Sequence, residues 1–224
     1  MSGMGRPPPE IPASEIIESW LARAFAAAPR RPPPDSPSLR VTLSGQGGGE
    51  WDLCATEEAL IVKRREPGSR HRPSPDSEVD HDPDIWLRQG VADFLALFHE
   101  EPDLPSLLPP QADVMDLLCI DQGRIGLLAQ IDGRIAFEIQ GRRRRRWTVD
   151  LAFGPSGMRA GRPRSTVRVD SRTCEELAAG VLAPLPALLA GRLQVEGDRA
   201  LVMQVVMLGG SVRRVVSSST QRAQ

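Results

Sequence analysis

The chain of 224 residues contains no tyrosine, and aromatic residues make up only 4% of it. Lys63 is its one lysine, so nearly all of the 28 basic residues are arginine. The 29 acidic residues balance them to a formal net charge of −1. The whole molecule therefore has no electrostatic bias toward binding a polyanion.

Cysteine is also scarce. Cys54, Cys119 and Cys174 are far apart and form no C-x-x-C pair, which favours free thiols in a reducing compartment. Cys54 falls on an expected strand with no histidine nearby, so we predict a buried structural thiol there. No stretch approaches the ~18 consecutive apolar residues of a membrane span, and the N-terminus has no apolar signal-peptide core. We therefore expect a cytoplasmic protein without a transmembrane segment.

Patterns that would support catalysis or hold a metal are missing as well. Asp80, Asp82 and Asp84 resemble the start of a calcium loop, but Ile85 stands where that loop needs glycine. The glycines of "GQGGG" are not followed by a lysine and a helix, as a phosphate loop requires. No histidine has a partner at metal-ligand spacing: His71, His81, His99. We expect no enzyme, no cofactor and no metal site.

What the sequence does contain is an internal repeat. Residues 41–53 ("VTLSGQGGGEWDL") align with residues 137–149 ("FEIQGRRRRRWTV") at a constant offset of 96, which matches Trp51 with Trp147. Residues 84–97 align with residues 166–179 at an offset of 82. A repeat of this length indicates two related modules.

Hydrophobic periodicity predicts short elements of both kinds. Asp132-Gly133 lies between two alternating runs, which indicates a hairpin turn. Thr173 and Glu176 fit a capping box at the start of a helix that ends at Gly180. The other expected strands lie near residues 41–54, 59–64, 84–89, 147–153, 165–169 and 192–196, with helices near 14–28, 91–98, 184–190 and 199–208.

The order of elements in residues 166–208 resembles the C-terminal half of the sterol carrier protein type 2 sterol-binding domain. The motif that carries the resemblance is Gly191-Arg192-Leu193-Gln194-Val195-Glu196-Gly197-Asp198, which precedes an apolar helix in that family. Trp51 and Trp147 stand where the family opens a strand with tryptophan. The first copy lacks the glycine-arginine motif and carries a long polar loop, so it departs further from the pattern.

The resemblance implies a mixed α/β fold in which each module is a twisted, mostly antiparallel sheet covered by short helices. It also implies an apolar tunnel for lipids, fatty acyl chains or sterol-like molecules, and no catalytic residue. Clustered apolar residues on the expected helices are candidates for the lining, with ordinary core packing as the alternative for each. These candidates are Phe94, Phe98, Leu177, Leu185, Leu188, Leu189, Met203 and Met207.

Five consecutive arginines, Arg142, Arg143, Arg144, Arg145 and Arg146, stand where the first copy has "QGGGE". The run has three interpretations: a solvated turn, transient contact with an anionic membrane surface, or contact with nucleic-acid phosphates. Trp147 is the only aromatic residue beside the run, whereas nucleic-acid sites use stacking aromatics. We therefore expect no nucleic-acid partner.

The sequence thus predicts a disordered leader (1–13), a divergent first module (14–120) with a long loop (65–83), a second module (121–208) and a flexible tail (209–224). The first functional hypothesis is non-enzymatic binding or transfer of a hydrophobic ligand. The alternative is a scaffold protein with filled cavities that accompanies an enzyme of lipid or isoprenoid metabolism.

Overall fold

In the computed structural model, the residues described are 6–28, 31–66, 82–105, 107, 122–159 and 161–210. The short helix that the sequence "ADVMDLLCID" predicts at residues 112–121, most of the long loop, Cys119 and the tail beyond residue 210 lie outside them. Two sets of elements flank the gap at residues 108–121, and we call them the first half and the second half.

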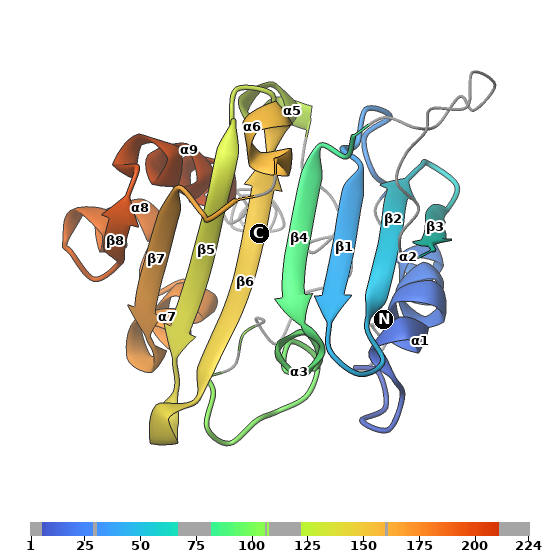
Figure 1. Cartoon of the computed structure of the whole chain (residues 1–224), viewed down its shortest axis with the longest axis horizontal. Coiled ribbons are helices and arrows are strands. Elements are labelled where there is room, and N and C mark those ends of the chain that lie inside the picture. Colours follow the sequence, from blue (N-terminus) through green and yellow to red (C-terminus); the bar gives the residue numbers. More distant parts are fainter. Residues whose placement is uncertain are drawn as a thin grey trace, which may run out of the picture.

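The first half begins with one continuous helical stretch, followed by four strands and a short helix (Figure 1). Its elements are α1 (Ala13–Glu15), the π-helical turn η1 (Ile16–Trp20), α2 (Leu21–Ala27), β1 (Leu39–Ser44), β2 (Gly49–Ala55), β3 (Leu60–Arg65), β4 (Ile85–Gly90) and α3 (Val91–Leu95).

The second half alternates strands and helices. Its elements are α5 (Gln122–Leu128), β5 (Gly133–Gln140), the 3-10 turn η2 (Arg142–Arg144), β6 (Arg146–Phe153), α6 (Gly154–Met158), β7 (Ser165–Asp170), α7 (Ser171–Ala179), α8 (Pro184–Leu189), β8 (Gln194–Gly197) and α9 (Arg199–Gly210).

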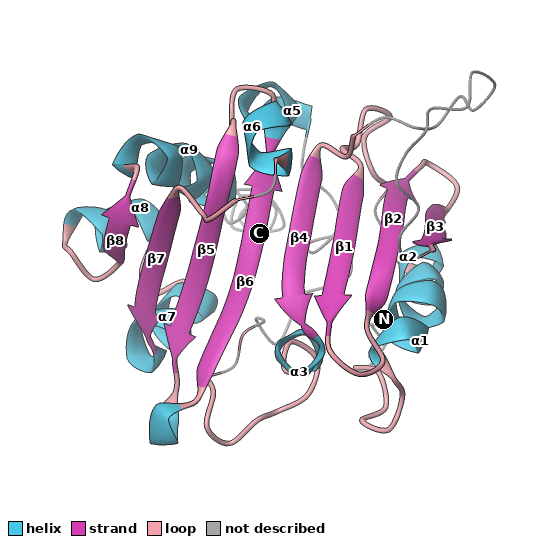
Figure 2. Ribbon diagram, viewed as in Figure 1, coloured by secondary structure: helices cyan, strands magenta, loops and turns pink. Residues whose placement is uncertain are grey.

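The described strands form one continuous, twisted sheet of eight strands in the order β3-β2-β1-β4-β6-β5-β7-β8 (Figure 2). The halves join where β4 pairs antiparallel with β6, with Leu87 opposite Leu151. Only β1–β4 and β5–β7 pair in parallel among the described strands. The predicted mixed α/β fold with a mostly antiparallel sheet is confirmed, and the halves share a single sheet.

The two halves use the same pairing scheme. In each, a hairpin (β1–β2 or β5–β6) is followed by a strand parallel to its first member (β4 or β7). Trp51 lies opposite Val41, and Trp147 lies opposite Ile139. The junction between β4 and β6, which we call the seam, extends the similarity. There β4 pairs antiparallel with β6, as β3 pairs antiparallel with β2 in the first half.

The register corrects part of the sequence alignment. The offset of 96 holds for β2 and β6, and the offset of 82 holds for β4 and β7, but Val41 corresponds to Ile139, an offset of 98. Gly45 therefore does not match Gly141. The reason is turn length: five residues separate Leu43 from its partner Gly49, whereas Gly141 and Arg145 close a turn of three residues with a 2.8 Å hydrogen bond.

The predicted hairpin at Asp132-Gly133 is wrong. Residues 122–128 form a helix, and Gly133 begins β5 with φ +155°. Asp132 instead accepts a 2.7 Å hydrogen bond from the backbone N–H of Ser156. A Cβ added at Gly133 would lie 2.6 Å from the side chain of Leu201, so glycine here permits close packing of β5 against α9.

Residues 6–12, which the sequence assigns to the leader, lie against the first half. Arg6 forms an ion pair with Glu100 at 3.4 Å, and Ile11 packs on the first-half core. That core includes the buried rings of Trp20, Phe25 and Trp51. A second core lies between β5–β7 and the helices α5, α8 and α9, and a third, smaller cluster surrounds Trp147.

Candidate functional site

On the side of the sheet that faces the helices, the apolar side chains differ in how far they are buried. Partly exposed apolar side chains run diagonally across it from the seam: Leu87 on β4, Leu151 on β6, Phe137 on β5 and Val169 on β7. We call these four residues the apolar strip. Its last three members pack against both the second core and the Trp147 cluster. The strip therefore leaves apolar surface accessible in the middle of the second half.

Helices of the second half border this strip. Leu177 on α7, Leu188 on α8 and Val205 on α9 are partly buried and pack against the same core as Phe137. All three residues are aliphatic, so the surroundings of the strip are apolar. Such a surface suits a hydrocarbon group and offers nothing to a charged one.

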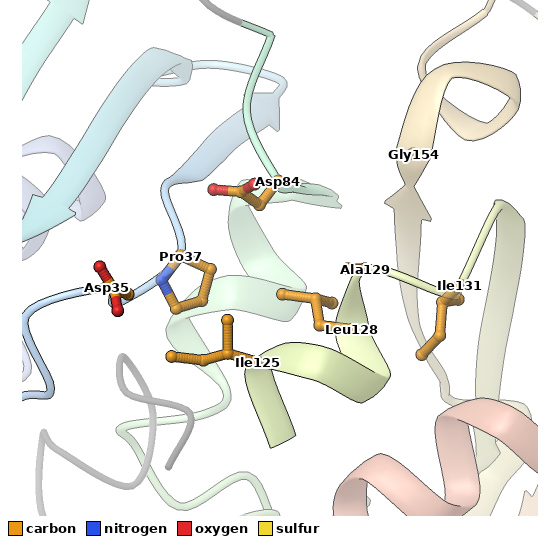
Figure 3. A pocket seen from close by; sticks show the side chains of 8 residues that line it. All are labelled: Asp35, Pro37, Asp84, Ile125, Leu128, Ala129, Ile131 and Gly154. Carbon is orange, nitrogen blue, oxygen red and sulfur yellow. The ribbon is translucent and has the colours of Figure 1, made fainter. Parts of the chain in front are cut away.

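A hollow of about 260 Å³ lies at the upper end of the seam, beside α5 (Figure 3). Asp84 and Gly154 are the residues next to the cross-strand pair Ile85 and Phe153, from which the apolar strip descends. Asp84 is held by the backbone N–H and hydroxyl of Ser38 at 2.7 and 2.8 Å. The hollow is lined by Asp35, Pro37, Asp84, Ile125, Leu128, Ala129, Ile131 and Gly154.

The residues predicted to line a tunnel do not lie together. Phe94 and Phe98 belong to the first-half core, where their rings meet edge to face at 5.3 Å. Leu177 and Leu188 border the apolar strip, and Met203 is partly buried on α9. Three others point outward, with exposed fractions of 40% for Leu185, 74% for Leu189 and 53% for Met207.

Three strip residues of the second half were not predicted from the sequence: Phe137, Leu151 and Val169. The predicted lining residues were all on helices, whereas these three residues are on strands. Their alternation with Glu138, Asp150 and Arg168 on neighbouring positions was the available signal.

In the first half, the layer between the helices and the sheet is more completely filled than in the second half. Trp20, Phe94 and Phe98 are at most 8% exposed, and Trp20 meets Phe98 edge to face at 5.5 Å. The indole of Trp51 is fully buried and donates a 2.7 Å hydrogen bond to Glu18. Large rings therefore fill the layer between α1–α2, α3 and the sheet.

The arginine run forms the turn between β5 and β6. Arg145 is bound to Asp93 at 2.6 Å and to Glu101 at 2.5 Å. The hydrogen bond that it donates to Glu101, followed by the one to Asp93, raises the pKa of Arg145 against the effect of burial. Arg142, Arg143, Arg144 and Arg146 are exposed, and the nearest carboxylate to Arg143 is Asp103 at 3.8 Å.

Arg143 and Arg144 adopt φ values of +49° and +66°, in the left-handed region that favours glycine. The longer first-half turn places Gly45 and Gly47 at positive φ. The tight turn of the second half thus holds two arginines where glycine would be less strained.

The prediction of a buried thiol at Cys54 is wrong, because Cys54 is exposed. It lies on the polar face of β2, opposite Ile61, so the strand was correctly expected but the face was not. Among the residues that the structure describes, no three His, Cys, Asp or Glu side chains are grouped to hold a metal, and no helix is long and apolar enough to cross a bilayer.

Residues 116–208 match the model of the SCP-2 sterol transfer family. This stretch contains every described element from α5 to β8 and most of α9. The chain therefore contains an SCP-2 sterol transfer family domain at residues 116–208, and the first half lies outside the match. No curated protein matches the chain.

Several solved structures are also similar to parts of the chain. Sterol Carrier Protein 2 Like 2 from Aedes aegypti has 21% identity and a TM-score of 0.26, covering 34% of this chain and 73% of that one. Sterol Carrier Protein 2 from Yarrowia lipolytica, in its apo form, has 13% identity and a TM-score of 0.28, covering 41% and 79%. The sterol carrier protein domain 2 of Helicoverpa armigera has 14% identity and a TM-score of 0.29, covering 42% and 85%.

Proposed function

We propose that the protein binds a hydrophobic ligand, such as a lipid, fatty acyl chain or sterol-like molecule, along the apolar strip. The observation that carries the proposal is accessible apolar surface inside the segment that matches a sterol transfer family. Burying about 10 methylenes there would contribute roughly 8 kcal/mol before ordering costs. No catalytic step is part of the proposal.

The proposal treats the halves as two related modules with different roles. The shared pairing scheme of β1–β2–β4 and β5–β6–β7 supports their relation. A second candidate function applies to the first half: its layer is filled by Trp20, Phe94 and Phe98, which favours a packed scaffold over a ligand site.

Contact with an anionic membrane surface is the role we assign to the arginine turn. Arg142, Arg143 and Arg144 project into solvent, and the strained backbone of the last two favours a use other than closing the turn. Each arginine near an anionic surface contributes about 1 kcal/mol. A protein that exchanges lipid would meet the bilayer through this turn.

The test is lipid uptake. Delipidated protein is incubated with phospholipid vesicles that contain fatty acid, recovered, and examined by native mass spectrometry. Phe137→Asp places a charge on the strip, and we expect it to lower retained lipid at least tenfold, because an unpaired carboxylate opposes an apolar ligand. Leu189→Asp is the matched control on an exposed position of α8 and should retain lipid.

A second variant, Val169→Phe, fills the strip without adding charge and should also lower uptake. Equal lipid retention by Phe137→Asp and the wild type, with both proteins folded by circular dichroism, would contradict the proposed site. Uptake that is unchanged when anionic lipid is removed from the vesicles would argue against the role of the arginine turn.

A further inference from the structure

Most helices lie on one side of the sheet, and few elements cover the opposite side (Figures 1 and 2). This opposite side carries polar side chains. Alternation along the strands places Arg40, Asp52, Arg88 and Asp150 on this side, whereas their neighbours face the helices. We call it the open face. Over its upper end, Gly157 of α6 packs against β5 and β6, and Arg134 donates a 2.7 Å hydrogen bond to the carbonyl of Gly161.

Trp86 lies near the centre of the open face. Its indole N–H donates a 2.8 Å hydrogen bond to the hydroxyl of Thr42. The guanidinium of Arg88 is stacked 3.5 Å from the ring centroid, and that of Arg40 lies 5.7 Å away. Stacking holds the Arg88 guanidinium in place without using its N–H donors.

Other cations around Trp86 have carboxylate partners. Arg40 binds Asp52 at 2.6 Å, and Arg65 binds Asp52 at 2.8 Å and Glu50 at 3.3 Å. Arg134 is paired with Asp150. Within the described part of the chain, the guanidinium of Arg88 has no carboxylate within 4.0 Å and no hydrogen-bond partner.

The described carboxylates of this group are bound to other guanidinium groups. Asp52 is bound by Arg40 and Arg65, Glu50 by Arg65, and Asp150 by Arg134. Partial burial, and then repulsion from Arg134, lower the pKa of Arg88, while Asp150 and Glu50 oppose that shift. Among the described ion pairs of this group, none involves Arg88.

Space is available beside it. Gly90 follows Arg88 on the same face of β4, and a Cβ added there would meet nothing within 4 Å. A small group can therefore approach Arg88 from the side of Gly90. On the neighbouring strand β1, Thr42 occupies the position opposite Arg88.

We propose that Arg88, held by Trp86, binds the carboxylate group of a small molecule on the open face. The planar fork of a guanidinium matches a carboxylate in a bidentate geometry. The single positive charge of the Arg88 guanidinium matches the single negative charge of a carboxylate. This site lies on the side of the sheet opposite the apolar strip and does not depend on lipid binding.

The test follows the four tryptophan indole N–H signals by NMR while sodium acetate replaces sodium chloride at constant ionic strength. We expect a saturable shift confined to Trp86, because Trp20, Trp51 and Trp147 are buried. Arg88→Gln should weaken binding at least tenfold. Arg146→Gln is the matched control, since it removes one exposed arginine about 13 Å along the neighbouring strand and should bind as the wild type does.

Thermal unfolding of each variant checks that the fold is kept. An equal shift in Arg88→Gln, or a shift that never saturates, would overturn the site. Tighter binding of inorganic phosphate than of acetate at the same position would overturn the assignment of a carboxylate. Loss of binding in Arg146→Gln as well would show a general charge effect and would also overturn the proposal.

Discussion

Trp51 and Trp147 occupy corresponding positions in the two halves, yet their indole N–H groups have different partners. Trp51 donates to the carboxylate of Glu18 on η1, and Trp147 donates at 2.7 Å to the backbone carbonyl of Asp93 on α3. The repeated tryptophan is readable from the sequence. Its partner depends on which helix crosses that strand, which no local pattern specifies.

The two described cysteines provide a prediction at the same scale. Cys54 is exposed, whereas burial raises the pKa of the Cys174 thiol to about 11. Because the thiolate is the reactive form, Cys174 stays protonated at pH 8 and should react with iodoacetamide at least 100-fold more slowly than Cys54. Mass spectrometry of peptides from a Cys119→Ser variant measures both rates. Comparable rates in native protein, before any unfolding, would contradict the burial of Cys174.

The start of α7 shows what decides an element boundary. The capping box predicted from Thr173 and Glu176 is wrong: Asp170 is the N-cap and accepts a 2.8 Å hydrogen bond from the N–H of Thr173. Glu176 instead binds Arg192 at 2.5 Å. Both patterns are present in the sequence, and the end of β7 at Asp170 selects between them. The predicted C-cap at Gly180, with φ +76°, is confirmed.

Asp170→Ala should destabilise the protein by about 1 kcal/mol at pH 7, the usual cost of losing an N-cap. The backbone hydrogen bond from Thr173 lowers the pKa of Asp170 below its usual 3.8. Because the folded pKa is lowered, the contribution is complete above pH 5 and is lost as the pH falls through the folded pKa. Urea unfolding at pH 7 and at pH 2.5 measures both differences. A deficit of equal size at the two pH values would exclude the carboxylate as its source.

In the molecule as a whole, the seam between β4 and β6 joins the halves. Leu87 packs against the first-half core and against the Trp147 cluster, so it belongs to both sides. Without this pairing each half would leave a strand edge unpaired in the middle of the sheet. The seam therefore makes the two halves one structural unit.

We expect the chain to unfold in a single cooperative transition. Leu87→Ala should lower the free energy of unfolding by about 2 kcal/mol, and by the same amount in both halves. Hydrogen exchange of peptides from β2 and β7 in increasing urea measures the two halves separately. Val181→Ala, at a position that is 79% exposed, is the control and should change neither. Destabilisation of only one half would contradict a shared unit.

Local sequence was sufficient for the mixed α/β class, most strands, the repeated tryptophans and the sterol-carrier-like segment, because these depend on alternation, turn residues and a motif. The two-residue change in turn length, the face on which Cys54 lies and the seam emerged only from the folded chain, because these depend on cross-strand register. Similar apolar patterns placed Phe94, Phe98, Leu177 and Leu188 in one predicted lining. In the folded chain, the two phenylalanines and the two leucines belong to different cores. Register and packing partners arise between distant segments, and apolar periodicity indicates that a face is buried without indicating what buries it.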